Sequence, residues 1–214
     1  KDDFILKVYG DQNIIKKTLL EKKVVSKKIE IIHTDGVVSD DETPLTAIKN
    51  SKNTSMWNAV NAQNYGEADI SLSAGNTGVL LVISRMILKT MDKVNKPALA
   101  GLWPSKKDMS VVLDLGANIE CDETNLIDFS EMGAALYRSI FPQNKPHVSL
   151  LNIGSEEIKG TETLKKAYIK LKELSDENNF LFDGYIEGNE IMDGKTNVIV
   201  TDGFTGNVAL KTAE

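Results

Sequence analysis

Short apolar runs alternate with segments of helical periodicity along this chain, and that alternation restricts the folds open to it. Two of the runs, Val111-Val112-Leu113 and Val198-Ile199-Val200, are continuously apolar rather than apolar at every second position. A strand of this kind is buried on both faces, which is typical of a parallel sheet covered by helices. We therefore expect an α/β fold with a doubly wound, mostly parallel sheet and helices on both faces.

The same pattern places the individual elements. Strands are expected near residues 4–9, 29–33, 68–73, 98–102, 110–115, 148–153, 180–185 and 197–201. Helices are expected over 11–23, 53–65, 76–90, 124–140, 161–174 and 204–214, where apolar residues recur every three or four positions. No repeat, low-complexity tract or Gly/Ser linker interrupts this order, so residues 1–214 are expected to form a single α/β domain.

Composition excludes several classes of protein. With 25 Lys+Arg against 31 Asp+Glu, the net charge of −6 argues against a dedicated nucleic-acid binder, and no nucleic-acid partner is expected. The single cysteine, Cys121, excludes an internal disulfide framework and suits the cytoplasm. No apolar run approaches the ~18 residues of a membrane-spanning helix; the one over residues 78–83 stops at Ser84-Arg85.

Four of the expected strands run into small, polar, glycine-containing turns. These turns are Ser73-Ala-Gly-Asn-Thr-Gly78, Asp114-Leu-Gly-Ala-Asn118, residues 152–160, and Asp202-Gly-Phe-Thr-Gly-Asn207. In a parallel α/β sheet such turns lie at the carboxyl edge, where ligands bind. Helix N-termini there offer unpaired N–H groups, and glycine allows a ligand to approach the backbone. A single turn is better explained as a helix cap, but four on one edge favour a site for a small anion or a polar acyl group.

Motifs for several other chemistries are absent from the sequence. It contains no Walker motif, no Gly-x-Gly-x-x-Gly after a strand and no Gly-x-Ser-x-Gly elbow. His33 and His147 are more simply structural or surface residues, and Cys121 has no obvious basic partner. The acidic run over 40–42 lacks the histidine or regular carboxylate spacing of a metal site. No metal and no cofactor are therefore expected.

Taken in order, the turns resemble those of the phosphate acyltransferase family of bacterial phospholipid synthesis (PlsX-type). The strings that carry the resemblance are the four turns above together with Lys52-Asn-Thr-Ser-Met56, Gly66-Glu-Ala-Asp69, Ile186-Glu-Gly188 and Leu210-Lys-Thr212. They cover nearly the whole chain in a fixed order. The resemblance implies a fold similar to those of phosphotransacetylases and of isocitrate and isopropylmalate dehydrogenases.

The resemblance also implies an activity and partners. A fatty acyl group would pass from acyl carrier protein to inorganic phosphate, and a membrane acyltransferase would use the acyl phosphate to acylate glycerol 3-phosphate. The family's first strand and its C-terminal hairpin and strands are missing, so the chain is expected to be truncated at both ends. At full length, the resemblance implies a cytoplasmic homodimer with peripheral contact at the inner face of the cell membrane through the missing hairpin.

Phosphate is itself a nucleophile and a thiolate leaves readily, so the residues needed are donors that hold a dianion beside an acyl carbonyl. On the resemblance, Lys159 is expected to neutralise phosphate charge or assist the departing sulfur, with Asn76 and Asn207 as further catalytic residues. The residues expected to bind substrate are Ser73, Gly75, Thr77 and Gly78 with Asn118 around the phosphate or oxyanion, Asn152 and Gly154 on the carrier-arm or acyl side, and Gly203, Thr205 and Gly206 at the rim.

Two other classes of function stay open at this point. A decarboxylating dehydrogenase of the related fold would need arginines to clamp a polycarboxylate, but the only arginines, Arg85 and Arg138, lie within helical patterns. A non-catalytic module that binds a carrier protein or a ligand would have the same turns. Formation of acyl phosphate from acyl carrier protein and phosphate separates an enzyme from such a module.

Overall fold

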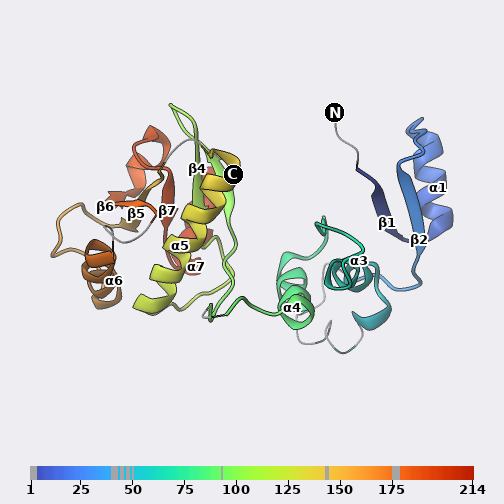
Figure 1. Cartoon of the computed structure of the whole chain (residues 1–214), viewed down its shortest axis with the longest axis horizontal. Helices are drawn as coiled ribbons and strands as arrows, with labels where there is room; N and C mark the ends of the chain where they lie inside the picture. The colour runs from blue at the N-terminus through green and yellow to red at the C-terminus, as the bar shows by residue number, and fades with distance from the viewer. Residues whose placement is uncertain are drawn as a thin grey trace. The chain divides into compact units, whose positions relative to one another are not determined.

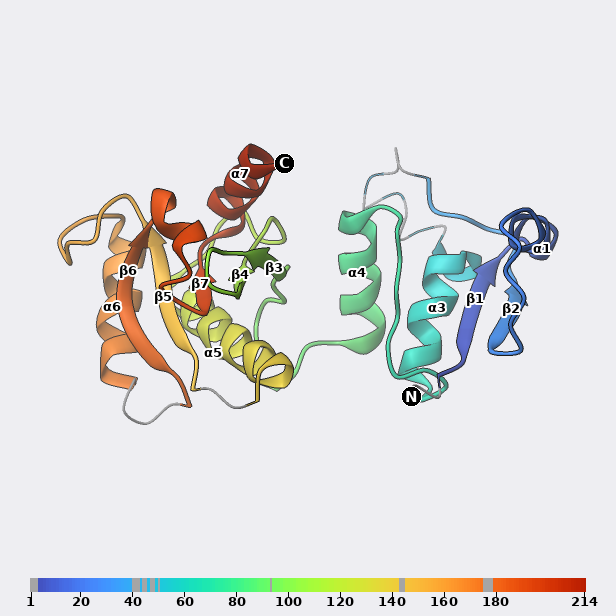
Figure 2. The same cartoon turned by 90° about the horizontal axis from the view of Figure 1, so that it is seen from above.

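The computed structural model describes residues 4–39, 43, 46, 49, 51–92, 94–142, 145–174 and 179–214. These residues belong to two compact units, Lys1–Met91 and Asp92–Glu214, which are described separately (Figures 1 and 2). The single domain expected over residues 1–214 stays a prediction. The acidic run over 40–42 lies outside the described residues.

The first unit, Lys1–Met91, begins with a βαβ element. Strands β1 (Leu6–Gly10) and β2 (Ile29–His33) pair in parallel, and helix α1 (Gln12–Glu21) connects them. The Asp11 carboxylate starts this helix by accepting the N–H groups of Asn13 at 2.7 Å and Ile14 at 3.1 Å. The strand and helix expected here from the sequence are thus confirmed.

Two further helices build the core of this unit. After the short helix η1 (Ser51–Asn53), helices α3 (Ser55–Asn64) and α4 (Thr77–Leu88) pack together. Their shared core consists of buried apolar side chains: Val38, Met56, Val60, Val79 and Ile83. Helix α4 covers most of the helix expected over 76–90.

The strand expected over 68–73 is wrong: this segment forms no strand. The Ser71 hydroxyl donates to the carbonyl of Ala59 at 2.9 Å, which ties the segment to helix α3. The apolar side chains of Ile70 and Leu72 are 82% and 88% exposed. Residues 68–73 pair with none of the described strands, although their apolar side chains alternate. A strand requires a neighbouring strand to pair with.

The second unit, Asp92–Glu214, contains a five-stranded sheet in the order β3-β4-β7-β5-β6. Its strands are β3 (Gly101–Pro104), β4 (Met109–Leu113), β7 (Val198–Val200), β5 (His147–Asn152) and β6 (Leu181–Glu187). All neighbours are parallel except β3, which pairs antiparallel to β4. The expected mostly parallel sheet is therefore confirmed in this unit.

The continuously apolar strands are buried on both faces, as expected. Val111 and Leu113 belong to the core beneath helices α5 (Glu123–Ile140) and α6 (Glu162–Leu174), whereas Val112 belongs to the core on the opposite face. That opposite face is covered by the helix η2 (Gly188–Asp193) and by helix α7 (Gly203–Ala213). Helices on both faces of the sheet confirm the α/β fold.

The strand expected over 98–102 begins later, at Gly101, and runs antiparallel rather than parallel. The cause is a tight turn, in which the Ser105 N–H donates to the carbonyl of Asp108 at 2.8 Å and reverses the chain into β4. No helix within the described part of the chain is both long and apolar enough to cross a membrane.

Candidate functional site

The turn after β4 is organised by one buried carboxylate. Asp114 is fully buried, and its side chain accepts backbone N–H groups of Leu99 and Gly116 at 3.1 Å, of Ala117 at 2.9 Å and of Asn118 at 2.8 Å. The Asn118 side-chain amide donates a fifth hydrogen bond at 2.7 Å. Because a buried charge is tolerated only with such partners, this residue fixes the conformation of the 114–118 turn.

Helix α7 packs directly against this turn. The Gly203 N–H donates to the Asn118 carbonyl at 2.7 Å, and the Asn118 amide also donates to the carbonyl of Pro97 at 2.7 Å. A Cβ at Gly203 would lie 2.6 Å from the Asn118 carbonyl oxygen, and one at Gly206 would lie 1.9 Å from that of Asp114. Close packing therefore explains these two glycines, while their expected contact with substrate stays a prediction.

The loop after β5, residues 152–160, is closed by an asparagine. The buried Asn152 amide donates to the carbonyl of Lys159 at 3.1 Å, and its oxygen accepts the N–H of Ile153 at 2.8 Å. Gly160 has a φ of 92° and brings the backbone against this side chain, where a Cβ would lie 2.5 Å from the amide oxygen. Gly154 is buried beside the aliphatic part of the Lys159 side chain. A Cβ added at Gly154 would lie 3.1 Å from the Cγ of Lys159.

The side chain of Lys159 is exposed on this loop and forms no ion pair with any residue that the structure describes. Its backbone N–H donates to the carbonyl of Glu156 at 3.0 Å. Backbone contacts thus hold the position of this lysine, while its ammonium group stays available for an incoming anion.

A tyrosine and a lysine on helix α6 hold the same loop. The Tyr168 hydroxyl donates to Glu157 Oε1 at 2.7 Å, and Lys172 Nζ donates to the same oxygen at 3.0 Å. The Tyr168 hydrogen bond, and next the Lys172 ammonium, keep the pKa of Glu157 below its ordinary value. Partial burial, together with the bond to Glu157, raises the pKa of Tyr168 to about 12.

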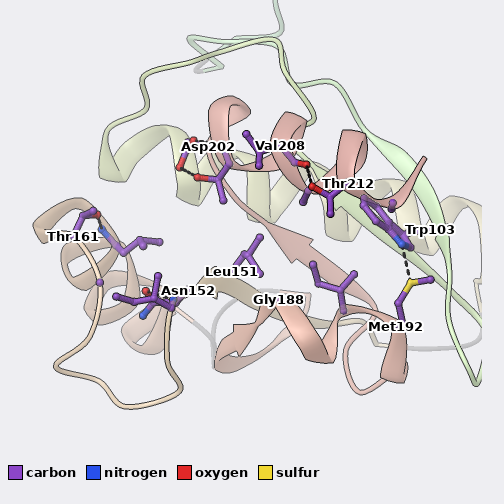
Figure 3. A pocket seen from close by; sticks show the side chains of 16 residues that line it. Trp103, Leu151, Asn152, Thr161, Gly188, Met192, Asp202, Val208 and Thr212 are labelled. Carbon is purple, nitrogen blue, oxygen red and sulfur yellow. Dashed lines mark hydrogen bonds between the residues drawn. The ribbon is translucent and has the colours of Figure 1, made fainter.

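A pocket of ≈ 1070 Å³ opens between the 152–160 loop, η2 and helix α7 (Figure 3). It is lined by Trp103, Leu151, Asn152, Ile153, Gly160, Thr161, Leu164, Gly188, Ile191, Met192, Asp202, Thr205, Val208, Ala209, Thr212 and Ala213. Figure 3 shows Asn152 and Thr161 at one end, and Trp103 and Met192 at the other. The pocket thus joins polar residues at the carboxyl edge of the sheet to a mostly apolar interior.

The polar end of the pocket carries a negative charge at the start of helix α7. The Asp202 carboxylate accepts the Thr205 N–H at 2.8 Å and the Thr205 hydroxyl at 2.9 Å. It therefore occupies the N-terminus of the helix, where an anionic ligand would otherwise be favoured. Asn207, one turn further, is exposed and donates to the carbonyl of Leu115 at 3.4 Å.

The turn expected to cradle phosphate lies in the other unit, Lys1–Met91. Asn76 caps helix α4 with a neutral side chain that accepts the Val79 N–H at 3.1 Å, and Ser73 accepts the Gly75 N–H at 3.2 Å. The first turn of α4 contains no acidic residue, and Thr77 and Gly78 are exposed there. This helix N-terminus is electrostatically suited to an anion.

The residues predicted in the second unit form two local groups. One group lies around the 114–118 turn and consists of Asn118, Gly203, Gly206 and Asn207. The other lies on the 152–160 loop and consists of Asn152, Gly154 and Lys159. Asn152 and Thr205 line the same pocket. Ser73, Gly75, Asn76, Thr77 and Gly78 lie in the first unit. The convergence of all these residues on one substrate stays a prediction.

Sequence reasoning missed the apolar part of the pocket, which includes Trp103, Ile191, Met192 and Val208. These side chains come from β3, η2 and α7, which are distant in sequence and meet only in the folded sheet. One sequence signal pointed to this part of the pocket. Ala209 and Ala213 lie four positions apart on the same face of the last helix, and their small side chains leave space beside that helix.

Comparisons with known proteins agree with this architecture. The family described as "Fatty acid synthesis protein" matches the chain over residues 1–214. A phosphate acyltransferase of Pelagibacter ubique is 53% identical over 97% of this chain, and one of Parvibaculum lavamentivorans is 46% identical over 97%. The chain spans 61% and 57% of the length of these two relatives.

A solved structure supports the fold. The EutD phosphotransacetylase from Staphylococcus aureus superposes with a TM-score of 0.68 over 99% of this chain and 74% of its own, at 17% identity. The phosphotransacetylase-like α/β fold expected from the sequence is thereby confirmed.

We predict that Gly206→Ala lowers the free energy of unfolding by about 3 kcal/mol, because the new methyl group would overlap the backbone of Asp114. Denaturant unfolding measures the change. Gly188→Ala is the matched control, since a Cβ there has no neighbour within 4 Å. Equal stability of the two variants would contradict the packing of α7 on the 114–118 turn.

We predict that Tyr168→Phe raises the pKa of Glu157 toward its ordinary 4.5, since the largest cause of its depression is removed. A lowered folded-state pKa contributes stability above pH 4.5 that is lost as the pH falls through the folded-state value, so the variant loses less on acidification. Carboxyl NMR titration measures this pKa, with Tyr65→Phe, at a 69% exposed tyrosine, as control. An unchanged Glu157 pKa in Tyr168→Phe would contradict the hydrogen bond.

Proposed function

The chain belongs to the family of fatty acid synthesis proteins, and from this premise we propose that it transfers a fatty acyl group from acyl carrier protein to inorganic phosphate. The products are an acyl phosphate and the free thiol of the carrier. The name phosphate acyltransferase of relatives 53% and 46% identical supports phosphate as the acceptor. The carrier protein as donor rests on the resemblance of the turns.

The observation that carries the proposal is the pocket beside the 152–160 loop. It has an apolar interior large enough for a fatty chain, and its polar end lies at the carboxyl edge of the sheet, next to Asn152 and Thr205. An acyl thioester has the same two parts, an apolar chain and a polar head. This match favours an acyl substrate over the polycarboxylate of a dehydrogenase.

Electrostatics favour helix α4 as the place for phosphate. The N-terminus of α7 is already occupied by the Asp202 carboxylate, whereas that of α4 has the neutral cap Asn76 and no acidic residue in its first turn. Phosphate would bind at the 73–78 turn through Ser73, Thr77 and backbone N–H groups next to Gly75 and Gly78. We assign Asn76 to the phosphate or the oxyanion.

The reaction needs no protein nucleophile. An oxygen of hydrogen phosphate attacks the thioester carbonyl carbon, so that a C–O bond forms and the C–S bond breaks. The electron pair of the C–S bond goes to sulfur, and the proton of hydrogen phosphate ends on the departing thiol. Each preorganised donor to the developing oxyanion contributes on the order of 3 kcal/mol. In this scheme Lys159 neutralises phosphate charge or assists the departing sulfur.

The remaining assignments complete the proposed site. Asn152 and Gly154 line the carrier-arm or acyl side, and Asn118 supports the oxyanion site by fixing the 114–118 turn. The rim is formed by Gly203, Thr205, Gly206 and Asn207, with Asn207 as a catalytic donor. We further propose a cytoplasmic homodimer with peripheral contact at the inner face of the cell membrane, where an acyltransferase acylates glycerol 3-phosphate with the product.

We predict that Lys159→Ala, made in the protein at the full length of its relatives, lowers turnover by a factor on the order of 10² to 10³ with folding intact. The assay follows carrier thiol released from acyl carrier protein and phosphate. Lys166→Ala, at an exposed lysine of helix α6, is the matched control. Near-normal turnover of Lys159→Ala would remove this lysine from the mechanism.

A further inference from the structure

The pocket is polar at one end and apolar at the other. Asn152, Thr161 and Asp202 lie toward one end, whereas Trp103 lies at the opposite end (Figure 3). Thr205 also lines the pocket, and its hydroxyl donates to the Asp202 carboxylate at 2.9 Å. An occupant that satisfies both ends must itself be polar at one end and apolar along its length.

The apolar end is lined by a tryptophan and by a methionine that is 45% exposed. Trp103 is 8% exposed, and its indole Nε1–H donates to the sulfur of Met192 at 2.9 Å (Figure 3). The indole N–H is the only donor of this side chain, so its pairing with the thioether leaves Trp103 no unpaired side-chain donor. The rings of Trp103 and the thioether of Met192 therefore form an apolar boundary.

The walls between the two ends add no charge. Leu151 and Ile191 lie on the sheet and η2 side, and Val208 and Ala209 lie on α7. The Thr212 hydroxyl, also on this wall, is used within the helix, where it donates to the carbonyl of Val208 at 2.8 Å. A saturated chain can thus lie along these walls without depriving the Thr212 hydroxyl of its hydrogen-bond partner.

The polar end selects a neutral head group. Asp202 places a carboxylate there, and this carboxylate would repel the anionic head of a free fatty acid. A thioester carries no charge and offers a carbonyl oxygen as acceptor. Among amphipathic ligands of this shape, the charge of the pocket therefore favours an acyl thioester.

We propose that this pocket measures the acyl chain, with the thioester beside Asn152 and Thr205, the terminal methyl group against Trp103, and Met192 as the residue that sets the longest chain accepted. This inference rests on the proposed acyl transfer for the identity of the ligand. Within the pocket, each added methylene strengthens binding about fourfold. Beyond the boundary formed by Trp103 and Met192, further carbons gain nothing or clash.

The test uses saturated acyl pantetheines of increasing length as neutral probes, with binding measured by titration calorimetry on this chain. Wild-type affinity is expected to rise about fourfold per methylene and then to stop rising at one length. Met192→Ala is expected to move that limit to longer chains, because it opens the boundary. Ala209→Leu is expected to move it to shorter chains, because it fills the middle of the pocket.

Met91→Ala is the matched control, since Met91 is 80% exposed and lies in the other unit; its limit should equal that of the wild type. Circular dichroism verifies that each variant is folded. A limit that stays in place in both folded pocket variants, or a wild type that does not bind the probes, would overturn the inference.

The same probes separate this inference from the proposed function. A sharp length limit that moves in Met192→Ala supports the inference even where the full-length protein releases no thiol with phosphate, a result that would refute acyl transfer alone. Thiol release that is equal for all chain lengths would support acyl transfer and overturn the length measurement by this pocket.

Discussion

The hydrogen bonds to the buried Asp114 carboxylate are the interaction on which the candidate site depends. Five N–H groups from residues 99 and 116–118 converge on one side chain that is removed from water. This shell fixes the 114–118 turn, and the start of α7 packs on that turn through Gly203 and Gly206. Because α7 forms one wall of the pocket, the shape of the pocket follows from a carboxylate that does not line it.

The two helix N-termini differ in charge. The carboxylate of Asp202 closes the start of α7 beside the apolar pocket, and the neutral Asn76 caps α4, which has no acidic residue in its first turn. The helix dipole favours an anion at the start of α4, whereas at the start of α7 the Asp202 carboxylate already occupies the N-terminus and repels a second anion. This asymmetry supports the proposal that phosphate binds at the 73–78 turn and a neutral thioester in the pocket.

The spacing of apolar residues predicted most strands and helices because these residues pack against neighbouring elements in the fold. Val111, Val112 and Leu113 indicated a strand buried on both faces, and the structure places them alternately in two cores. The pattern was wrong over 68–73, where Ile70 and Leu72 alternate with serines but have no described strand to pair with. It also missed that β3 runs antiparallel to β4, since the direction of a strand is decided by the hydrogen bonds of the turn at Ser105 and not by periodicity.

The sequence alone determined the α/β fold of the second unit, the order of the polar turns and the residues they present, because periodicity and glycine placement are local properties. Only the tertiary structure decided that Gly203 and Gly206 serve packing, that Asn118 belongs to the shell of Asp114, and that an apolar pocket lies behind the polar edge. Its walls come from strands and helices far apart in the chain. Their side chains become neighbours only through the strand order β3-β4-β7-β5-β6, which no local pattern contains.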